Sequence, residues 1–311
     1  MTFLDRPGVP ASDRNGAEPK APTPGSVYFL TGVTGFLGKV MLEELLRRRE
    51  ELAVERVIVV IRPKGGQCAA VRFQCEVADS PCFSGLPPQW TRSVTVREGK
   101  LDEPGLGLSP EGVALLGGVT HVVHTAASVS FNLPIADAAR ANITTSLNML
   151  DLARTCPKLI RLVSVSTAYV TPHPGDATPI WEVLAPLPVP AAKMYASIQD
   201  GSALGAEMLA SSGHPNTYTL TKAIAEHLLV ERRGAVPLTI VRPSIISASR
   251  KTPFAGWIDS AAGFGAFVVL LGLGQLRAVI GDSRTRLDLV PVDEVAQRIV
   301  LACQNDTAPI E

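Results

Sequence analysis

Apolar, β-rich segments alternate with amphipathic segments along most of the chain. The β-rich segments cover residues 26–32, 56–63, 94–101, 120–128, 159–170 and 237–244. The amphipathic segments repeat their apolar residues at helical spacing and cover residues 36–51, 135–156 and 218–233. Strands without polar alternation are buried on both faces, which is typical of a parallel sheet covered by helices. The pattern therefore predicts an α/β fold, a doubly wound parallel sheet of the Rossmann type with right-handed crossovers.

Three regions depart from this alternation. Residues 1–25 mix charge with proline and lack an apolar signal core, so we expect a flexible tail. Residues 171–194 are rich in proline and predict a long loop, and loops of that length in compact domains are usually functional. After residue 249 the alternation weakens. We therefore expect a Rossmann domain over 26–249 and a small, partial substrate-binding lobe over 250–311.

The first predicted strand is followed at once by glycines spaced as GxxGxxG, and a predicted helix comes next. Gly32 permits a tight turn, Gly35 lets the backbone approach a pyrophosphate, and Gly38 lets helix and strand pack closely. The helix N-terminus then offers free amides to the phosphates. The alternative is an ordinary glycine turn. We expect the cofactor contacts of this loop to come from Gly32, Thr34, Gly35, Phe36, Leu37 and Gly38.

The end of the second predicted strand bears on the choice of cofactor. NAD-binding proteins place an acid there for the ribose hydroxyls, but this chain has Arg62, followed by Lys64. A guanidinium forms charge-assisted hydrogen bonds with a 2′-phosphate, whereas a carboxylate repels it. The sequence therefore predicts NADPH rather than NADH. The alternative is a solvated surface arginine.

A tyrosine and a lysine lie four residues apart at the start of the helix predicted over 218–233. Tyr218 and Lys222 therefore share one helix face. An ammonium beside a phenol favours the phenolate, lowers the tyrosine pKa and makes the group a usable proton donor. Because the pattern YxxxK is common, an ordinary helix surface is the alternative.

Together these segments resemble an extended short-chain dehydrogenase/reductase. The broad likeness rests on TGVTGFLG, HTAAS, STAYV and YTLTK. More narrowly, the chain is similar to the fatty acyl-CoA reductases with their male-sterility-type NAD-binding domain. That likeness rests on residues 29–39, 122–127, 166–170 and 215–223, and on VRPS (241–244), GWID (256–259) and PVD (291–293). The resemblance covers about residues 26–303.

The resemblance implies roles for particular residues. Thr167 would orient the carbonyl oxygen, Tyr218 would donate the proton, and Lys222 would hold the nicotinamide ribose. Asn142 would support the lysine. Further cofactor contacts would come from Leu101, Ala126, Ala127 and Pro243.

Two positions depart from the family pattern, and one of them is Thr145-Ser146, where the family usually has Gly-Thr after the asparagine. The family usually has Gly-Asp after the third strand, with the acid near the adenine. This chain has Gly99-Lys100-Leu101-Asp102, which leaves the adenine contact open.

The same resemblance implies the reaction. We expect a long-chain acyl-CoA to be reduced with NADPH to a fatty aldehyde, a primary alcohol or both, with no protein nucleophile. One alternative is a thioester reductase domain linked to a carrier protein. Another is a different extended reductase that acts on a sugar nucleotide or a steroid.

Composition narrows the partners and the compartment. The formal net charge is 0, which argues against a nucleic-acid partner. Five cysteines without a CxxC pair fit a reduced, cytoplasmic protein, and we expect no metal. The mean hydropathy of +0.21 is high, partly because of the apolar segment 261–274, which is too short to span a bilayer. A buried helix is the first expectation for that segment. A surface that meets an acyl chain or the face of a membrane is the second.

Overall fold

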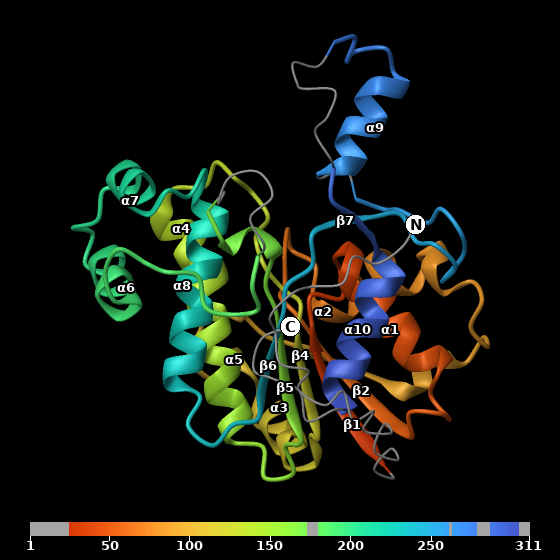
Figure 1. Cartoon of the computed structure of the whole chain (residues 1–311). Helices are drawn as coiled ribbons and strands as arrows, with labels where there is room; N and C mark the ends of the chain where they lie inside the picture. The colour runs from red at the N-terminus through yellow and green to blue at the C-terminus, as the bar shows by residue number, and fades with distance from the viewer. Residues whose placement is uncertain (1–24, 173–179, 261–262, 279–286, 305–311) are drawn as a thin grey trace, which may run out of the picture.

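A six-stranded parallel sheet forms the centre of the molecule (Figure 1). This computed structural model describes residues 25–172, 180–260, 263–278 and 287–304, so the predicted tail lies outside the described residues. The strands are β1 (Ser26–Thr31), β2 (Val54–Ile61), β3 (Val94–Glu98), β4 (His121–His124), β5 (Arg161–Val165) and β6 (Leu238–Val241). Their order is β3-β2-β1-β4-β5-β6, and every neighbouring pair is parallel. The prediction of a doubly wound α/β fold is confirmed.

Helices cover both faces of the sheet (Figure 1). One face carries α1 (Phe36–Arg47), α2 (Ala69–Phe73) and α10 (Val292–Gln304). The other carries α4 (Ile135–Ala139), α5 (Thr145–Arg154) and α8 (Thr217–Arg232), while the short α3 (Pro110–Ala114) precedes β4. Alternate residues of each strand enter the two cores. Tyr28 and Leu30 pack with α1 and α10, whereas Val27 and Phe29 pack with α5 and α8.

The helix predicted over 135–156 contains a π-helical turn between α4 and α5. That turn covers Arg140–Thr144, and its residue Asn142 is buried. The side-chain hydroxyls of Thr145 and Ser146 donate to the carbonyls of Ala141 and Asn142, each at 2.7 Å. Single π-turns inside helices often mark functional sites, and the helical periodicity of the sequence did not reveal this one.

The proline-rich segment after β5 is shorter than the predicted loop 171–194. Helix α6 (Ala191–Gln199) begins directly after Pro190, and α7 (Gly205–Ser212) follows before α8. Proline is well suited to a helix start because its missing amide needs no partner there. Met194 and Ile198 of α6 are buried in a core shared with α8. Part of the loop, residues 173–179, lies outside the described residues.

The C-terminal part divides between the sheet body and a projecting element. Helix α10 packs on α1, and its Ile299 joins the core of that face. Strands β7 (Ile245–Ser247) and β8 (Leu289–Pro291) pair in parallel. Between them α9 (Phe264–Gly272) stands clear of the body (Figure 1).

The expectation of a buried helix over 261–274 is wrong for the described residues, because α9 buries only Gly265. Phe264 is half-buried, and the other large apolar side chains of α9 are exposed, namely Phe267, Val268, Val269, Leu270 and Leu271. Within the described part of the chain, none of the helices is both long and apolar enough to cross a membrane.

Candidate active site

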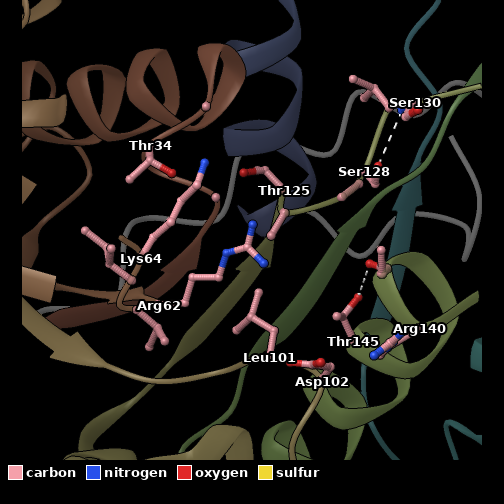
Figure 2. Close-up of a pocket in the computed structure, with 18 of the residues that line it drawn as sticks. Thr34, Arg62, Lys64, Leu101, Asp102, Thr125, Ser128, Ser130, Arg140 and Thr145 are labelled. Atoms are coloured by element: carbon pink, nitrogen blue, oxygen red, sulfur yellow. Dashed lines mark hydrogen bonds between the residues drawn. The ribbon is translucent and has the colours of Figure 1, made fainter. Parts of the chain in front are cut away.

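A cavity of about 910 Å³ opens at the carboxyl ends of β1, β2 and β4 (Figure 2). In this sheet the strand order reverses between β1 and β4, and open α/β sheets bind ligands at such a switch point. The lining contains these predicted cofactor residues: Gly32, Thr34, Gly35, Arg62, Lys64, Leu101, Ala126 and Ala127. The predicted contacts that do not belong to the lining are Phe36, Leu37, Gly38, Tyr218, Lys222 and Pro243.

The glycine loop owes its shape to two positions where no side chain fits. Gly32 has φ +83°, and a Cβ there would lie 2.5 Å from the Oγ1 of Thr125. A Cβ on Gly38 would lie 2.0 Å from the carbonyl oxygen of Gly32. Contacts that short are not tolerated, so both positions require glycine for the turn and for close packing of α1. The predicted roles of these two glycines match the geometry.

The start of α1 presents amides that no side chain caps. Gly35 is the N-cap residue, no side chain accepts a hydrogen bond from the first turn, and that turn contains no acidic residue. The exposed amides and the positive end of the helix dipole favour an anion. The cradle therefore fits the pyrophosphate of a dinucleotide.

Two cations enter the cavity from the end of β2. Figure 2 shows the side chains of Arg62 and Lys64 directed into it. Among the described residues, neither has an ion-pair partner within 4.0 Å. Arg72 also lines the cavity, but its guanidinium donates to Glu76 at 2.7 and 2.8 Å and to the Arg62 carbonyl at 2.6 Å. Arg62 and Lys64 are thus available to an anionic ligand, whereas Arg72 holds the strand end in place.

The segment after β3, where the sequence departs from the family pattern, lies at the edge of the cavity. Leu101 and Asp102 line the cavity, but Lys100 does not, and its ammonium pairs with Glu103 at 2.8 Å. The lysine therefore replaces the usual acid without pointing its charge at the ligand. In Figure 2, Arg140 and Thr145 of the π-turn region lie beside Asp102, and none of these three was predicted as a cofactor contact.

Tyr218 lies in the first turn of α8, which Asn216 caps by accepting from the Thr219 amide at 2.9 Å. Burial raises the pKa of Tyr218 to about 12, and a hydrogen bond with Thr167 opposes that rise. The structure thus brings together the predicted tyrosine and the predicted threonine at the end of β5. The prediction that a neighbouring ammonium lowers the pKa of Tyr218 is wrong here, because desolvation is the largest effect.

The ammonium of Lys222 is directed at the sheet. Its Nζ donates to the Val165 carbonyl at 2.7 Å. Burial lowers the pKa of Lys222 to about 8, while the charge of Glu226 one turn on opposes that shift. Glu226 is itself buried and paired with Arg242, whose Nε donates to it at 2.9 Å. The low pKa of Lys222 therefore follows mainly from the burial of its own ammonium.

Asn142 connects the lining of the cavity to α8. Its Oδ1 accepts from the Ser128 amide at 2.9 Å, and its Nδ2 donates to the Thr221 hydroxyl at 3.1 Å. Asn142 thus contacts the residue next to Lys222. On the other side of the site, the Pro243 carbonyl accepts from the Ala168 amide at 2.9 Å, which places Pro243 beside Thr167.

The motifs near the C-terminus hold the segment that follows β7. The carboxylate of Asp293, from PVD, accepts from the amides of Arg250, Lys251 and Thr252 at 2.8 to 3.1 Å. Asp259, from GWID, pairs with Lys39 of α1. These residues join the C-terminal segment to the helix that forms the phosphate cradle, which gives them a structural role.

A family model described as Male sterility protein matches residues 30–299. The chain belongs to this family. Fatty acyl-CoA reductase 1 of Gallus gallus is 36% identical over 285 residues, which are 89% of this chain and 54% of the relative. Fatty acyl-CoA reductase 2 of Homo sapiens is 31% identical over 87% of this chain and 53% of the relative. The chain therefore spans about half the length of the curated relatives it matches.

Solved structures agree with the fold. The terminal R domain from the myxalamid PKS-NRPS biosynthetic pathway has a TM-score of 0.67 and 28% identity, over 90% of this chain and 63% of that one. The reductase domain of a nonribosomal peptide synthetase from Mycobacterium tuberculosis has a TM-score of 0.60 and 24% identity, over 94% of this chain and 66% of that one. Family membership and the phosphate cradle together indicate a nicotinamide cofactor in the cavity.

Proposed function

We propose that this chain reduces a fatty acyl-CoA thioester with NADPH to a fatty aldehyde, a primary fatty alcohol or both. The observation that carries the proposal is the half-buried Tyr218, which bonds to the buried Thr167 and lies one helical turn from the buried Lys222, near a dinucleotide cavity. Support for the substrate class comes from the curated fatty acyl-CoA reductases that this chain resembles over most of its length.

Thr167, Tyr218, Lys222 and Asn142 would each have a separate role in the proposed reduction. When bound, the nicotinamide cofactor supplies a hydride to the carbonyl carbon of the substrate. Thr167 and Tyr218 then hydrogen-bond the oxygen on which negative charge develops, in a site with little water. Tyr218 gives that oxygen a proton, and Lys222 lies one turn behind it in α8. The C–S bond of the resulting thiohemiacetal then breaks, so that the aldehyde forms and CoA leaves as the free thiol. Asn142 positions the loop after β4 against α8.

The proposal also specifies which nicotinamide cofactor is used, namely NADPH rather than NADH. Arg62 and Lys64 follow β2, where a dinucleotide places the ribose next to the adenine. Both side chains enter the cavity and neither is paired within the described chain. A 2′-phosphate would satisfy the two charges, whereas the ribose hydroxyls of NADH would leave them unpaired.

Peripheral contact with a membrane is a further part of the proposal, together with a cytoplasmic location. Phe267 and Leu271 of α9 are exposed, and residues 261–276 contain no charged side chain. A helix of this kind can bury apolar surface at the boundary of a bilayer. Long acyl-CoA substrates partition to the same boundary, so the contact would place the site near its substrate.

The direct test is an assay of the purified chain with NADPH and palmitoyl-CoA. Loss of NADPH absorbance should accompany formation of free CoA thiol, and product analysis should identify hexadecanal or hexadecanol. Cofactor binding measured separately, with no reduction of acyl-CoA of any length, would overturn the proposal. Sedimentation with phosphatidylcholine vesicles tests the membrane contact, which Leu270→Ser and Leu271→Ser should abolish.

A carrier-protein thioester is the second candidate substrate. The observation in its favour is the 28% identity to the terminal R domain of a PKS-NRPS pathway. The same assay discriminates the two, with palmitoyl groups presented on CoA or on a phosphopantetheinylated carrier protein. A kcat/KM at least tenfold higher for the carrier-bound thioester would favour this second candidate.

A further inference from the structure

An aromatic side chain lies against Tyr218 and is nevertheless largely open to solvent. The rings of Phe131 and Tyr218 have centroids 5.9 Å apart, at an interplanar angle of 36°. Phe131 is 57% exposed. The ring therefore offers an apolar surface next to the half-buried Tyr218, and an alkyl group that covered it would gain free energy by leaving water. We propose that Phe131 is a specificity-determining residue, which contacts the alkyl chain of the acyl substrate where that chain leaves the reacting carbonyl.

The position of Phe131 follows from the segment between β4 and α4. Ser128, Val129 and Ser130 line the cofactor cavity, and Phe131 is the next residue. Phe131 therefore follows the cavity lining directly in the chain and contacts the ring of Tyr218. Tyr169, 41% exposed, follows Thr167 on the β5 side and offers a second aromatic ring at the end of that strand.

This segment is held at both ends, so Phe131 cannot readily retreat into the protein. The Ser128 backbone exchanges two hydrogen bonds with the Asn142 side chain, at 2.9 and 3.3 Å. The Leu133 carbonyl accepts from the Thr217 hydroxyl at 2.9 Å. A side chain on a fixed loop loses little conformational freedom when a ligand covers it, and this makes the contact more favourable.

The chemistry of the segment fits an alkyl chain better than the CoA group. Residues 125–136 contain no charged side chain, and Val129 is 56% exposed next to Phe131. Phosphates require cations, whereas methylene groups gain free energy by leaving water for an apolar surface. The inference rests on the proposed function, since it names the residue that contacts the acyl chain of the proposed substrate.

The experiment compares Phe131→Ala with Val113→Ala, a control in α3 at the opposite end of the sheet, where Val113 is 51% exposed (Figure 1). Kinetics are measured with palmitoyl-CoA and butyryl-CoA, and calorimetry measures palmitoyl-CoA binding to the NADP⁺-loaded protein. For Phe131→Ala we expect kcat/KM and affinity for palmitoyl-CoA to fall about tenfold. For butyryl-CoA we expect less than about a twofold change, because few methylene groups reach the ring. Phe131→Leu should restore most of the loss, and Val113→Ala should behave as the wild type.

Two results would overturn the inference. Equal loss for both substrates would mean that Phe131 acts through Tyr218 and does not contact the chain. Unchanged affinity for palmitoyl-CoA would mean that the ring stays uncovered. If the wild type binds acyl-CoA but reduces none, the proposed function fails, while the binding ratio between the two variants still decides this inference.

Discussion

The cofactor side and the substrate side of the site differ in how completely the chain builds them. On the cofactor side, backbone atoms come so close that Gly32 and Gly38 have no room for a Cβ. On the proposed substrate side, Phe131 next to Tyr218 is 57% exposed. Close packing fixes the cradle for one ligand shape, whereas open apolar surface accepts chains of different length. The contrast indicates that the cofactor cradle is preorganised, and under the proposed function an acyl chain would cover the open surface beside Tyr218.

The largest expected effect lies where the two sides meet. Tyr218→Phe should lower kcat by about 10³, since a positioned general acid contributes about 10² to 10⁴. NADPH affinity, measured by cofactor fluorescence, should not change. Tyr195→Phe is the matched control, because its hydroxyl bonds to Thr144 at 2.7 Å in the core under α6. Retention of the full rate by Tyr218→Phe would exclude its role as proton donor.

A pair of glycine substitutions tests the contrast in packing. In Gly38→Ala the new Cβ would meet the Gly32 carbonyl at 2.0 Å, so we expect a loss of about 3 kcal/mol in unfolding free energy and of NADPH binding. Gly272→Ala in α9 would meet nothing within 4 Å and should change stability by less than about 0.5 kcal/mol. Chemical denaturation measures both. Equal effects would contradict the difference in packing between the two regions.

Cofactor preference is expected to depend on Arg62. Arg62→Ala should lower the NADPH/NADH ratio of kcat/KM about tenfold to 100-fold, because a charged hydrogen bond contributes about 1.5 to 3 kcal/mol. Arg56→Ala, at an exposed position of the same strand, is the control. An unchanged ratio for Arg62→Ala would mean that the side chain does not meet a 2′-phosphate.

The smallest effect concerns a buried carboxyl in the core behind the cradle. Burial raises the pKa of Glu43 in α1 to about 7 from 4.5, and the nearby Arg47 opposes that rise. The folded state therefore binds this proton more tightly than the unfolded chain, and the associated stability is lost as pH rises from about 4.5 through 7.

Glu43→Gln removes that titration. Its Tm should exceed the wild-type Tm by about 2 °C at pH 8 and by nothing measurable at pH 4.5. The exposed Glu50→Gln should show neither change. Differential scanning calorimetry at the two pH values makes the comparison, and a gain at pH 4.5 equal to that at pH 8 would contradict the assignment.

Local pattern was sufficient for the cofactor half of the site. Glycine spacing after a strand predicted the cradle, because the conformations that need Gly32 and Gly38 are dictated by neighbours in the chain. Arg62 and Lys64 were predicted from their place after β2, and both line the cavity. Arg72 and Arg140 were missed, since they come from separate helices that carry no motif of their own.

Helix α9 and the surroundings of Tyr218 depended on contacts that the sequence pattern does not encode. An apolar segment such as 264–272 fits a buried helix as well as an exposed one, and only packing distinguishes the two. The exposure of Phe131 beside Tyr218 likewise requires the loop after β4 to meet α8.

By itself, the sequence determined the parallel sheet, the phosphate cradle and the pairing of Tyr218 with Lys222 on one helix, because chain-local spacing specifies all three. Tertiary structure alone decided that Lys222 donates to the Val165 carbonyl, that the pKa of Tyr218 rises and that α9 stays uncovered. The physical reason is that desolvation and burial depend on the whole surroundings of a group, which segments distant in the chain supply only after they fold together.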